Sequence, residues 1–387
     1  MKRTAELLIA LFCAGFVYSQ TTPAGRKPVS DDVFKSGAVR FVPEITITDE
    51  AMGGKGFFSQ LSDLAVDDRG HIYVADYKEI NIKVFDASGA FQKTIGRKGQ
   101  GPGEFSALVQ IEISNGRLYA WDIGHIIILD LEGAYIKSIP VKKAFTWRTL
   151  RALPDGRFLV EKYLVDRQDP GHKEEALLDL YSADFDFLKT IYRREIHRYK
   201  PITEPVAMDL SIPFATELFS EVLPDGRIVI GYSGSYEIEI HDPDKGKLSS
   251  FSRTYEPVEV TTKDKKMYFA GLSYMTQDSS GGLPTLHRGA ADYMIKNTEF
   301  PKFKPPFSNI RTDAQGRIWV MLYGPEPSLD SFRMDVFDRS GRFLGHARIV
   351  DGLSYRRMAF VADGFWSIRT NDVDEPTVVK YRIEAAR

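Results

Sequence analysis

Short apolar stretches alternate with polar turns along this chain, and one arrangement of them returns six times. An apolar stretch runs into a turn that holds Gly, and a second apolar stretch follows, as in residues 64–76 around Gly70. Because Asp-Gly and Asn-Gly turns join strands into tight hairpins, each copy predicts two antiparallel strands. A repeat of this kind decides the architecture before any single residue does. The six copies are residues 64–76, 111–122, 150–160, 221–230, 310–320 and 360–368.

Each copy continues into further strands. A second polar turn and a fourth apolar stretch close the unit in five copies, as in residues 91–95 and 343–347. Four antiparallel strands repeated around an axis are the blades of a β-propeller. We therefore predict an all-β fold, a six-bladed β-propeller of four-stranded blades. The third strand of each blade is expected at residues 82–85, 126–129, 178–181, 236–240, 334–337 and 378–381.

The sixth copy lacks its fourth strand, because the chain reaches its last residue soon after the third. Residues 39–47 form a spare strand before the first copy. We expect this N-terminal strand to pair with the last blade, which would close the ring and leave no unpaired edge.

The residues at the start of the repeat also carry a family resemblance. Ile72-Tyr-Val-Ala-Asp76, Val84-Phe-Asp86-Ala-Ser-Gly89 and Gly99-Gln-Gly-Pro-Gly-Glu-Phe105 resemble the NHL-repeat family of six-bladed propellers, above all its exported and largely uncharacterised bacterial type. The resemblance covers about residues 37–387, although the third, fourth and sixth copies lack the Asp that ends the first two. It implies the fold and says little about function.

The first residues have the features of a secretory signal peptide. Lys2 and Arg3 precede an apolar run over residues 7–17, and cleavage is expected near Ser19-Gln20. The run is shorter than the roughly 20 residues of a spanning helix. We therefore expect a signal peptide over residues 1–19, a flexible segment over 20–36 and the propeller over 37–387. The mature protein would be secreted or periplasmic, without a transmembrane span.

Cys13 is the single cysteine of the chain, and it lies inside the apolar run. A lipoprotein modified at Cys13 is the alternative that we favour less, because the large side chain of Phe12 precedes it. Cleavage near Ser19 would leave no cysteine for a disulfide, a nucleophile or a metal site. The net charge of −2 shows no basic excess of the kind that nucleic-acid binding requires, so no nucleic-acid partner is expected. We expect a monomer.

The long connections fall on one side of the predicted disc. They span residues 164–175, 195–217 and 258–306, after a second or a fourth strand in each case. In an antiparallel blade these two kinds of connection leave from the same face, opposite the Gly turns. The last connection predicts a helical insertion between blades 4 and 5, over about residues 259–304, with helices near 262–275 and 285–297. Loops held by a rigid scaffold concentrate function, so this face is the predicted working face.

The chain contains no Gly-x-Ser-x-Gly, His-Glu-x-x-His or phosphate-loop motif. Its seven histidines do not converge from inner strands, as a zinc site would need. No cofactor is therefore expected, and a divalent metal bound by carboxylates remains the alternative.

The predicted working face collects aromatic and charged side chains that end second strands, precede first strands or lie in an insert. Such side chains combine contact area with hydrogen bonding, which suits recognition of a ligand. The structural alternative for each is a contact within the fold, as when Asp binds backbone amides. The candidates are Asp76, Lys98, Asp122, His125, Trp147, Arg148, Lys162, Arg167, Tyr232, Tyr323, Arg357 and Arg369.

These observations favour an exported, non-catalytic binding or scaffold protein that recognises a protein, peptide or glycan ligand on the insert-bearing side. The alternative is a hydrolase or lyase in the central channel, with a divalent metal held by carboxylates such as Asp76 and Asp122. Enzyme activity stays open, with the balance against it, because no catalytic residue stands out.

Overall fold

The computed structural model describes residues 28–35, 39–141, 146–166, 173–202, 208–274, 288–324, 332–349, 358–371 and 375–385. The expected signal peptide, Cys13 and the Ser19-Gln20 position lie outside the described residues, as do Arg167 and Arg357.

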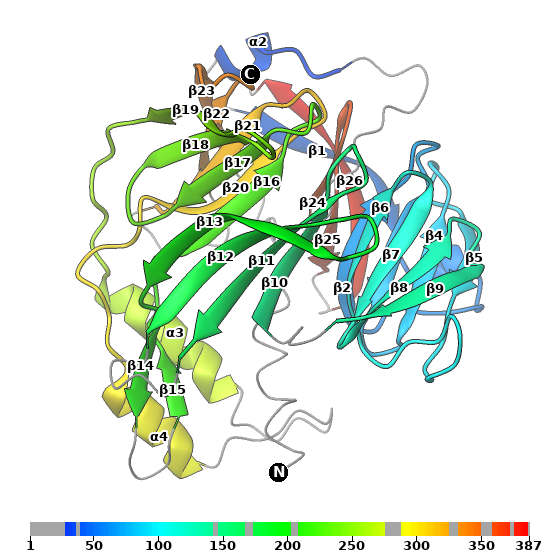
Figure 1. The fold of residues 1–387 in the computed structure, drawn as a ribbon, viewed down its shortest axis with the longest axis horizontal. Helices are drawn as coiled ribbons and strands as arrows, with labels where there is room; N and C mark the ends of the chain where they lie inside the picture. Colours follow the sequence, from blue (N-terminus) through cyan, green and yellow to red (C-terminus); the bar gives the residue numbers. More distant parts are fainter. Residues whose placement is uncertain are drawn as a thin grey trace.

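Six antiparallel sheets of four strands each are arranged around an axis, which confirms the predicted six-bladed propeller (Figure 1). In blades 1 to 5 the strands follow chain order, whereas in the last blade the N-terminal strand lies beside the C-terminal one. First strands of neighbouring blades contact one another along the axis. Blades 1 to 3 are β2 (Leu61–Val66), β3 (Ile72–Asp76), β4 (Asn81–Phe85), β5 (Phe91–Ile95); β6 (Leu108–Ser114), β7 (Arg117–Asp122), β8 (His125–Asp130), β9 (Tyr135–Pro140); and β10 (Trp147–Ala152), β11 (Phe158–Val165), β12 (Glu174–Tyr181), β13 (Phe187–Ile196). Blades 4 to 6 are β16 (Leu218–Val222), β17 (Ile228–Tyr232), β18 (Glu237–Asp242), β19 (Gly246–Ser252); β20 (Phe307–Thr312), β21 (Ile318–Leu322), β22 (Phe332–Phe337), β23 (Phe343–Ile349); and β24 (Met358–Val361), β25 (Gly364–Thr370), β26 (Pro376–Ala385), β1 (Val39–Ile47).

The ring closes through the two ends of the chain. β1 pairs antiparallel with β26, from Val39 opposite Ala385 to Ile47 opposite Val378. The Phe41 ring meets the Phe365 ring of β25 edge to face at 4.7 Å. This pairing confirms the predicted closure of the last blade by the N-terminal strand.

The Gly turns are tight for a local reason. Gly70, Gly156 and Gly226 have φ of +83°, +87° and +84°. Residues other than glycine rarely adopt this region. In the first turn the Asp67 carboxylate accepts hydrogen bonds from the backbone N–H groups of Arg69 and His71. These contacts keep the turns short, and the face that carries them is called the bare face below.

The bare face holds the N-terminal segment. α2 (Asp32–Lys35) lies at the end of the strands opposite to α3 and α4 (Figure 1). Phe34 is fully buried and its ring meets Trp319 at 5.2 Å, while Arg317 donates to the Val29 carbonyl at 2.8 Å. Residues 28–35, which the sequence placed in a flexible segment, are thus packed against blades 5 and 6, because Phe34 fills an apolar site between these blades.

The opposite face, called the insert-bearing face, carries the long connections. α3 (Thr262–Tyr274) and α4 (Arg288–Asn297) confirm the helical insertion between blades 4 and 5. A hairpin of β14 (Tyr199–Ile202) and β15 (Met208–Ser211), which the sequence did not predict, lies beside them (Figure 1). An ion pair between Lys200 and Glu299 joins the hairpin to the segment after α4. Within the described ranges, no helix is both long and apolar enough to cross a membrane.

Candidate functional site

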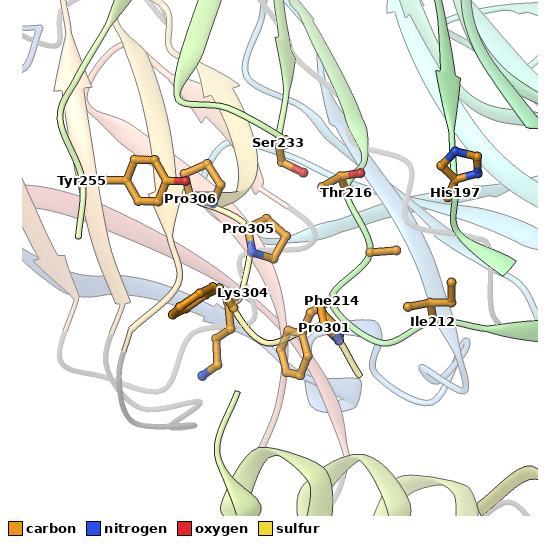
Figure 2. A pocket seen from close by; sticks show the side chains of 13 residues that line it. His197, Ile212, Phe214, Thr216, Ser233, Tyr255, Pro301, Lys304, Pro305 and Pro306 are labelled. Carbon is orange, nitrogen blue, oxygen red and sulfur yellow. The ribbon is translucent and has the colours of Figure 1, made fainter. Parts of the chain in front are cut away.

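A pocket of about 300 Å³ opens on the insert-bearing face, between blade 4 and the segment that returns from the helical insert (Figure 2). Three stretches of chain form it together with His197 and Tyr255. Its lining residues are His197, Ile212, Phe214, Ala215, Thr216, Ser233, Gly234, Tyr255, Pro301, Phe303, Lys304, Pro305 and Pro306.

One side of the pocket is apolar and stiff. Pro301, Pro305 and Pro306 come from the returning segment, and proline rings fix the backbone around them. The Tyr255 and Phe303 side chains remain 39% and 41% exposed. Large aromatic side chains that stay accessible beside a pocket are typical anchors for a ligand.

The other side of the pocket is polar. The Ser233 hydroxyl accepts a hydrogen bond from the Glu217 amide at 2.8 Å. The Thr216 hydroxyl lies 2.6 Å from the Tyr232 hydroxyl. Figure 2 shows the Ser233 and Thr216 hydroxyls together on one side, with His197 beyond them and Tyr255 with Pro306 on the far side. The pocket therefore presents a polar edge opposite an apolar wall.

Lys304 holds the returning segment in place. Its side chain is 2% exposed, and its Nζ lies 2.7 Å from an Asp264 carboxylate oxygen in the first turn of α3. The same Nζ donates to the Gly324 carbonyl of blade 5 at 3.2 Å and lies 5.5 Å from the Phe214 ring centre. Burial alone would raise the pKa of Asp264, but hydrogen bonds from Lys304 and Thr261 outweigh it and lower that pKa. Lys304 thus links the insert, blade 5 and the pocket.

A charged cluster adjoins the pocket between blades 3 and 4. Arg148 donates to both carboxylate oxygens of Glu217, at 3.2 and 3.3 Å, and its Nε lies 3.5 Å from Glu161. Its guanidinium carbon lies 4.7 Å from the centre of the Tyr163 ring. Burial raises the pKa of the Glu161 carboxyl to about 7, although the charge of Arg148 opposes the shift. Because Glu217 also bonds Ser233, this cluster and the pocket share one stretch of backbone.

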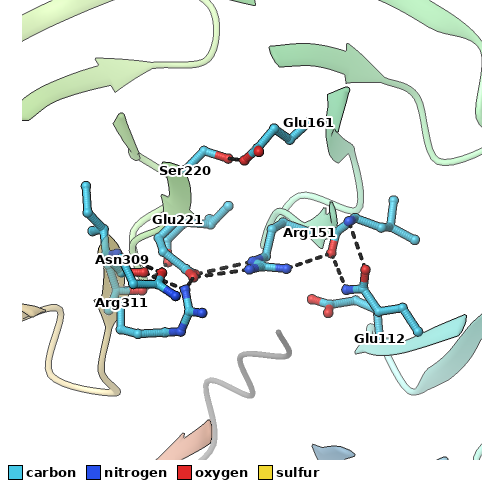
Figure 3. A network of polar contacts seen from close by, with 12 residues as sticks. Glu112, Arg151, Glu161, Ser220, Glu221, Asn309 and Arg311 are labelled. Atoms are coloured by element: carbon cyan, nitrogen blue, oxygen red, sulfur yellow. Dashed lines mark hydrogen bonds and ion pairs between the residues drawn. The ribbon is translucent and has the colours of Figure 1, made fainter. Parts of the chain in front are cut away.

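A second set of buried charges lies deeper, where the first strands meet. Glu221 lies between two guanidinium groups, at 3.2 Å from Arg151 and 2.6 Å from Arg311 (Figure 3). Glu112 is also buried; its carboxylate accepts the Ala152 amide at 3.1 Å, and burial raises its pKa well above the ordinary value. None of these four residues is among the candidates predicted from the sequence. The signal was available, since all four residues occupy the same register position of their first strands, with acid and base alternating from blade 2 to blade 5.

Three sequence candidates border the pocket. Tyr232 bonds the pocket residue Thr216, and the Tyr323 ring meets the Phe214 ring edge to face at 5.6 Å. Arg148 reaches the pocket through Glu217. The structure therefore gathers these three around blades 3 to 5, and their contact with a ligand stays a prediction.

Two candidates, Asp76 and Asp122, are buried, and their carboxylates accept hydrogen bonds from backbone amides. Asp76 accepts the amides of Ser59 and Gln60 at 2.8 and 3.1 Å and pairs with buried Lys83 at 3.0 Å. Burial alone would raise the pKa of Asp76, but these amides and Lys83 lower it. Asp122 accepts the amides of Ser106 and Ala107 in the same way. Each carboxylate holds the segment that leads into its own blade.

The remaining described candidates are spread around the ring. Lys162 pairs with Asp179 and Arg369 donates to the Tyr381 hydroxyl at 2.8 Å, both within their own blades. Trp147 is buried against Trp121, with ring centres 5.7 Å apart. Lys98 and His125 are exposed. Over the part of the chain that the structure describes, no group of three or more His, Cys, Asp or Glu residues is placed to hold a metal ion.

Comparisons with known proteins agree with the fold. Residues 56–192 match a family model, DUF5128, described as a 6-bladed beta-propeller. No curated protein matches the chain. Among solved structures, a DUF4221-family protein from Bacteroides vulgatus is similar at a TM-score of 0.54 and 11% identity, covering 91% of this chain and 100% of its own. A candidate exported protein from Bacteroides fragilis is similar at 0.51 and 12% identity, covering 95% of this chain and 99% of its own.

Likeness at 11 and 12% identity carries information on the fold alone. The resemblance to NHL repeats stays a prediction. From its sheets, its closure and these comparisons, the chain is a six-bladed β-propeller.

Proposed function

We propose that this protein is an exported, non-catalytic binding or scaffold module that recognises a protein, peptide or glycan ligand on the insert-bearing face. The observation that carries the proposal is the pocket between blade 4 and the returning segment, with Tyr255 and Phe303 accessible at its side. Concave sites with an aromatic wall and a few convergent polar groups are the usual form of a ligand site.

The stiffness of the pocket supports the proposal. Three prolines fix the wall, and the buried pair of Lys304 and Asp264 fixes the segment that carries them. A site that is formed before binding loses less conformational entropy when the ligand arrives. The bare face, by contrast, consists of short turns and the packed N-terminal segment.

A screen of the full chain by thermal shift tests the proposal, because a ligand of the folded state raises the melting temperature by mass action. The screen uses peptide, protein and glycan libraries. We expect the hits to lose their effect in the double variant Tyr255→Ala and Phe303→Ala and to keep it in Arg69→Ala, an exposed position on the bare face. Ligands whose effect is lost in Arg69→Ala and kept in the double variant would bind the bare face, and this would contradict the proposal.

Export is part of the same proposal, and the N-terminal sequence supports it. Mass spectrometry of the mature protein from a bacterial host should find Gln20 as the first residue. A lipid on Cys13 would replace the secreted or periplasmic form with an anchored one. A retained N-terminus in the cytoplasm would contradict export.

One observation favours the second candidate function, a hydrolase or lyase in the channel. Glu161 is a buried carboxyl with a pKa of about 7, and such a group can exchange a proton near neutral pH. The enzyme hypothesis also calls for a divalent metal held by carboxylates. Elemental analysis of protein purified without chelators tests it, and a stoichiometric metal that is lost in Glu161→Gln or Asp122→Ala would favour the enzyme over the binding module.

A further inference from the structure

The pocket has two unlike sides, and together they restrict what can enter. Tyr255, Pro305 and Pro306 supply flat apolar surface, whereas Ser233, Thr216 and His197 supply hydroxyl and imidazole groups on the other side (Figure 2). A purely apolar group would leave the polar side without partners, which is unfavourable for buried hydroxyls. The ligand group that fits must therefore be apolar on one face and polar along its edge.

The charge of Lys304, which lines the pocket, is compensated. Its ammonium lies 2.7 Å from an Asp264 carboxylate oxygen, and both side chains are only 2% exposed. A charged ligand group would thus be desolvated here without an opposite charge left for it. This balance favours a ligand group that carries no charge.

The polar side can still form hydrogen bonds. A hydroxyl has one donor hydrogen and two acceptor lone pairs. The Ser233 hydroxyl accepts from Glu217, and within the described residues it donates to no acceptor. The Thr216 and Tyr232 hydroxyls share one hydrogen bond, so that pair also retains capacity. Both donors and acceptors are available to a ligand that has hydroxyl groups of its own.

We propose that this pocket binds one neutral pyranose ring of a sugar. The C–H face of the ring would lie on the wall of Tyr255 and the prolines, and its hydroxyls would bond Ser233, Thr216 and His197. The inference rests on the proposed function and names the ligand class at the same site. The ring can come from a free sugar or from the end of a longer glycan, since both present the same chemistry.

Titration of the full chain with the methyl glycosides of glucose, galactose and mannose tests the inference by saturation-transfer NMR and calorimetry. We expect at least one to bind with a Kd on the order of 1 mM, typical of so small a ligand. Tyr255→Ala should weaken it about tenfold. Ser233→Ala should weaken it severalfold and also lower the melting temperature, because the Glu217 amide loses its acceptor. Tyr135→Ala is the matched control, because Tyr135 is 42% exposed on the outer strand of blade 2 and should leave binding unchanged. A neutral glycan array then separates a terminal ring on a long chain from a free sugar.

The outcomes separate this inference from the proposed function. If a peptide binds in a way that depends on Tyr255 and no sugar binds, the inference of a pyranose site is wrong. The proposed binding function would still hold. Sugar binding that is equal in Tyr255→Ala, Ser233→Ala and the parent would place the ring elsewhere and overturn the inference. No dependence of any ligand on the insert-bearing face would overturn both.

Discussion

Glu161 shows how strongly burial can shift the pKa of a single carboxyl group. Its carboxylate lies on β11, with the Arg148 Nε at 3.5 Å and the Ser220 hydroxyl donating to it at 3.4 Å. Both contacts are long, so they only partly offset the loss of water around the charge. The pKa of Glu161 is accordingly raised to about 7.

This shift predicts a fall in stability as the pH rises. Between the ordinary carboxyl pKa of 4.5 and the folded value near 7, the folded protein keeps a proton that the unfolded chain has released. The free energy of unfolding therefore decreases through this window, by about 3 kcal/mol from Glu161 alone, and changes no further above it. Urea denaturation at pH 4.5, 6 and 7.5 should show this fall in the parent and a smaller one in Glu161→Gln.

Glu195→Gln serves as the control for this measurement, because Glu195 is exposed on the outer strand of the same blade. It should keep the pH dependence of the parent. The same dependence in Glu161→Gln would show that this carboxyl is ionised in the fold at neutral pH.

Asp76 and Asp122 show why residue type and position alone do not identify a binding residue. Both end second strands on the predicted working face, where a ligand contact or a metal ligand was a reasonable expectation. In the structure their oxygens are occupied by amides of the segments before β2 and β6. A short polar side chain next to a turn bonds the nearest backbone first, and the sequence contains no sign of which amides fold back onto it.

At the scale of elements, a buried ion pair contributes to closing the base of the helical insert. Thr261 caps α3 by accepting the Asp264 amide at 3.1 Å, and Asp264 in turn binds Lys304, which lies 40 residues further along the chain. The loop between them is therefore closed at its base. The pocket wall lies at this closure, since Pro301 and Phe303 precede Lys304 and Pro305 and Pro306 follow it directly.

Lys304→Met should destabilise the protein by about 3–5 kcal/mol, because it leaves the Asp264 carboxylate buried without its cation. The double variant with Asp264→Asn should recover a large part of that loss, as expected for two residues in direct contact. Urea denaturation of the four proteins in this cycle measures the coupling. Additive effects of the two single variants would mean that the pair does not hold the insert.

Lys302→Met is the matched control for that cycle. Lys302 is two positions earlier on the same segment and is exposed, with its Nζ 4.9 Å from the Phe303 ring centre. Its replacement should change stability by less than about 0.5–1 kcal/mol. A loss as large as that of Lys304→Met would point to the whole segment rather than to the ion pair.

The elements were predictable to the extent that local signals specify them. Gly turns and apolar strands are read within ten or fifteen residues, so the blades, the closing strand and both insert helices followed from the sequence. The β14–β15 hairpin was missed because Pro201 lies inside β14 and argues against a strand. The pocket could not be predicted, because it joins Ser233 to Pro305 across an insert whose path depends on packing.

At the scale of the whole molecule, the bare face and the insert-bearing face carry different elements. The bare face takes the N-terminal segment, with Phe34 and Arg317 as its contacts, and the insert-bearing face carries the hairpin, the helices and the pocket. Residues 28–35 therefore lie on the face opposite the pocket. On the bare face, ion pairs such as Arg157 with Asp244 join neighbouring blades, here blades 3 and 4, at 2.7 Å.

Closure of the ring by β1 is the feature on which the whole assembly depends. β1 supplies the fourth strand of blade 6, and its Val39 and Phe41 side chains are buried in the same cluster as Phe365 and Tyr381. Without it, β26 would present ten residues of unpaired edge and an open apolar surface. Three truncations separate the contribution of β1 from that of the segment before it. The first removes residues 1–27. The second removes 1–38 and with them α2, and the third removes 1–47 and with them β1 as well.

We expect the first truncation to fold like the parent and the second to lose about 3–5 kcal/mol, mainly from the buried Phe34 ring. The third should lose cooperative unfolding and associate, because the exposed β26 edge can pair with a second chain. Thermal denaturation and size-exclusion chromatography distinguish these results. A monomeric and cooperative protein from the third truncation would mean that blade 6 is stable with three strands, and ring closure would then be a minor contribution to the fold.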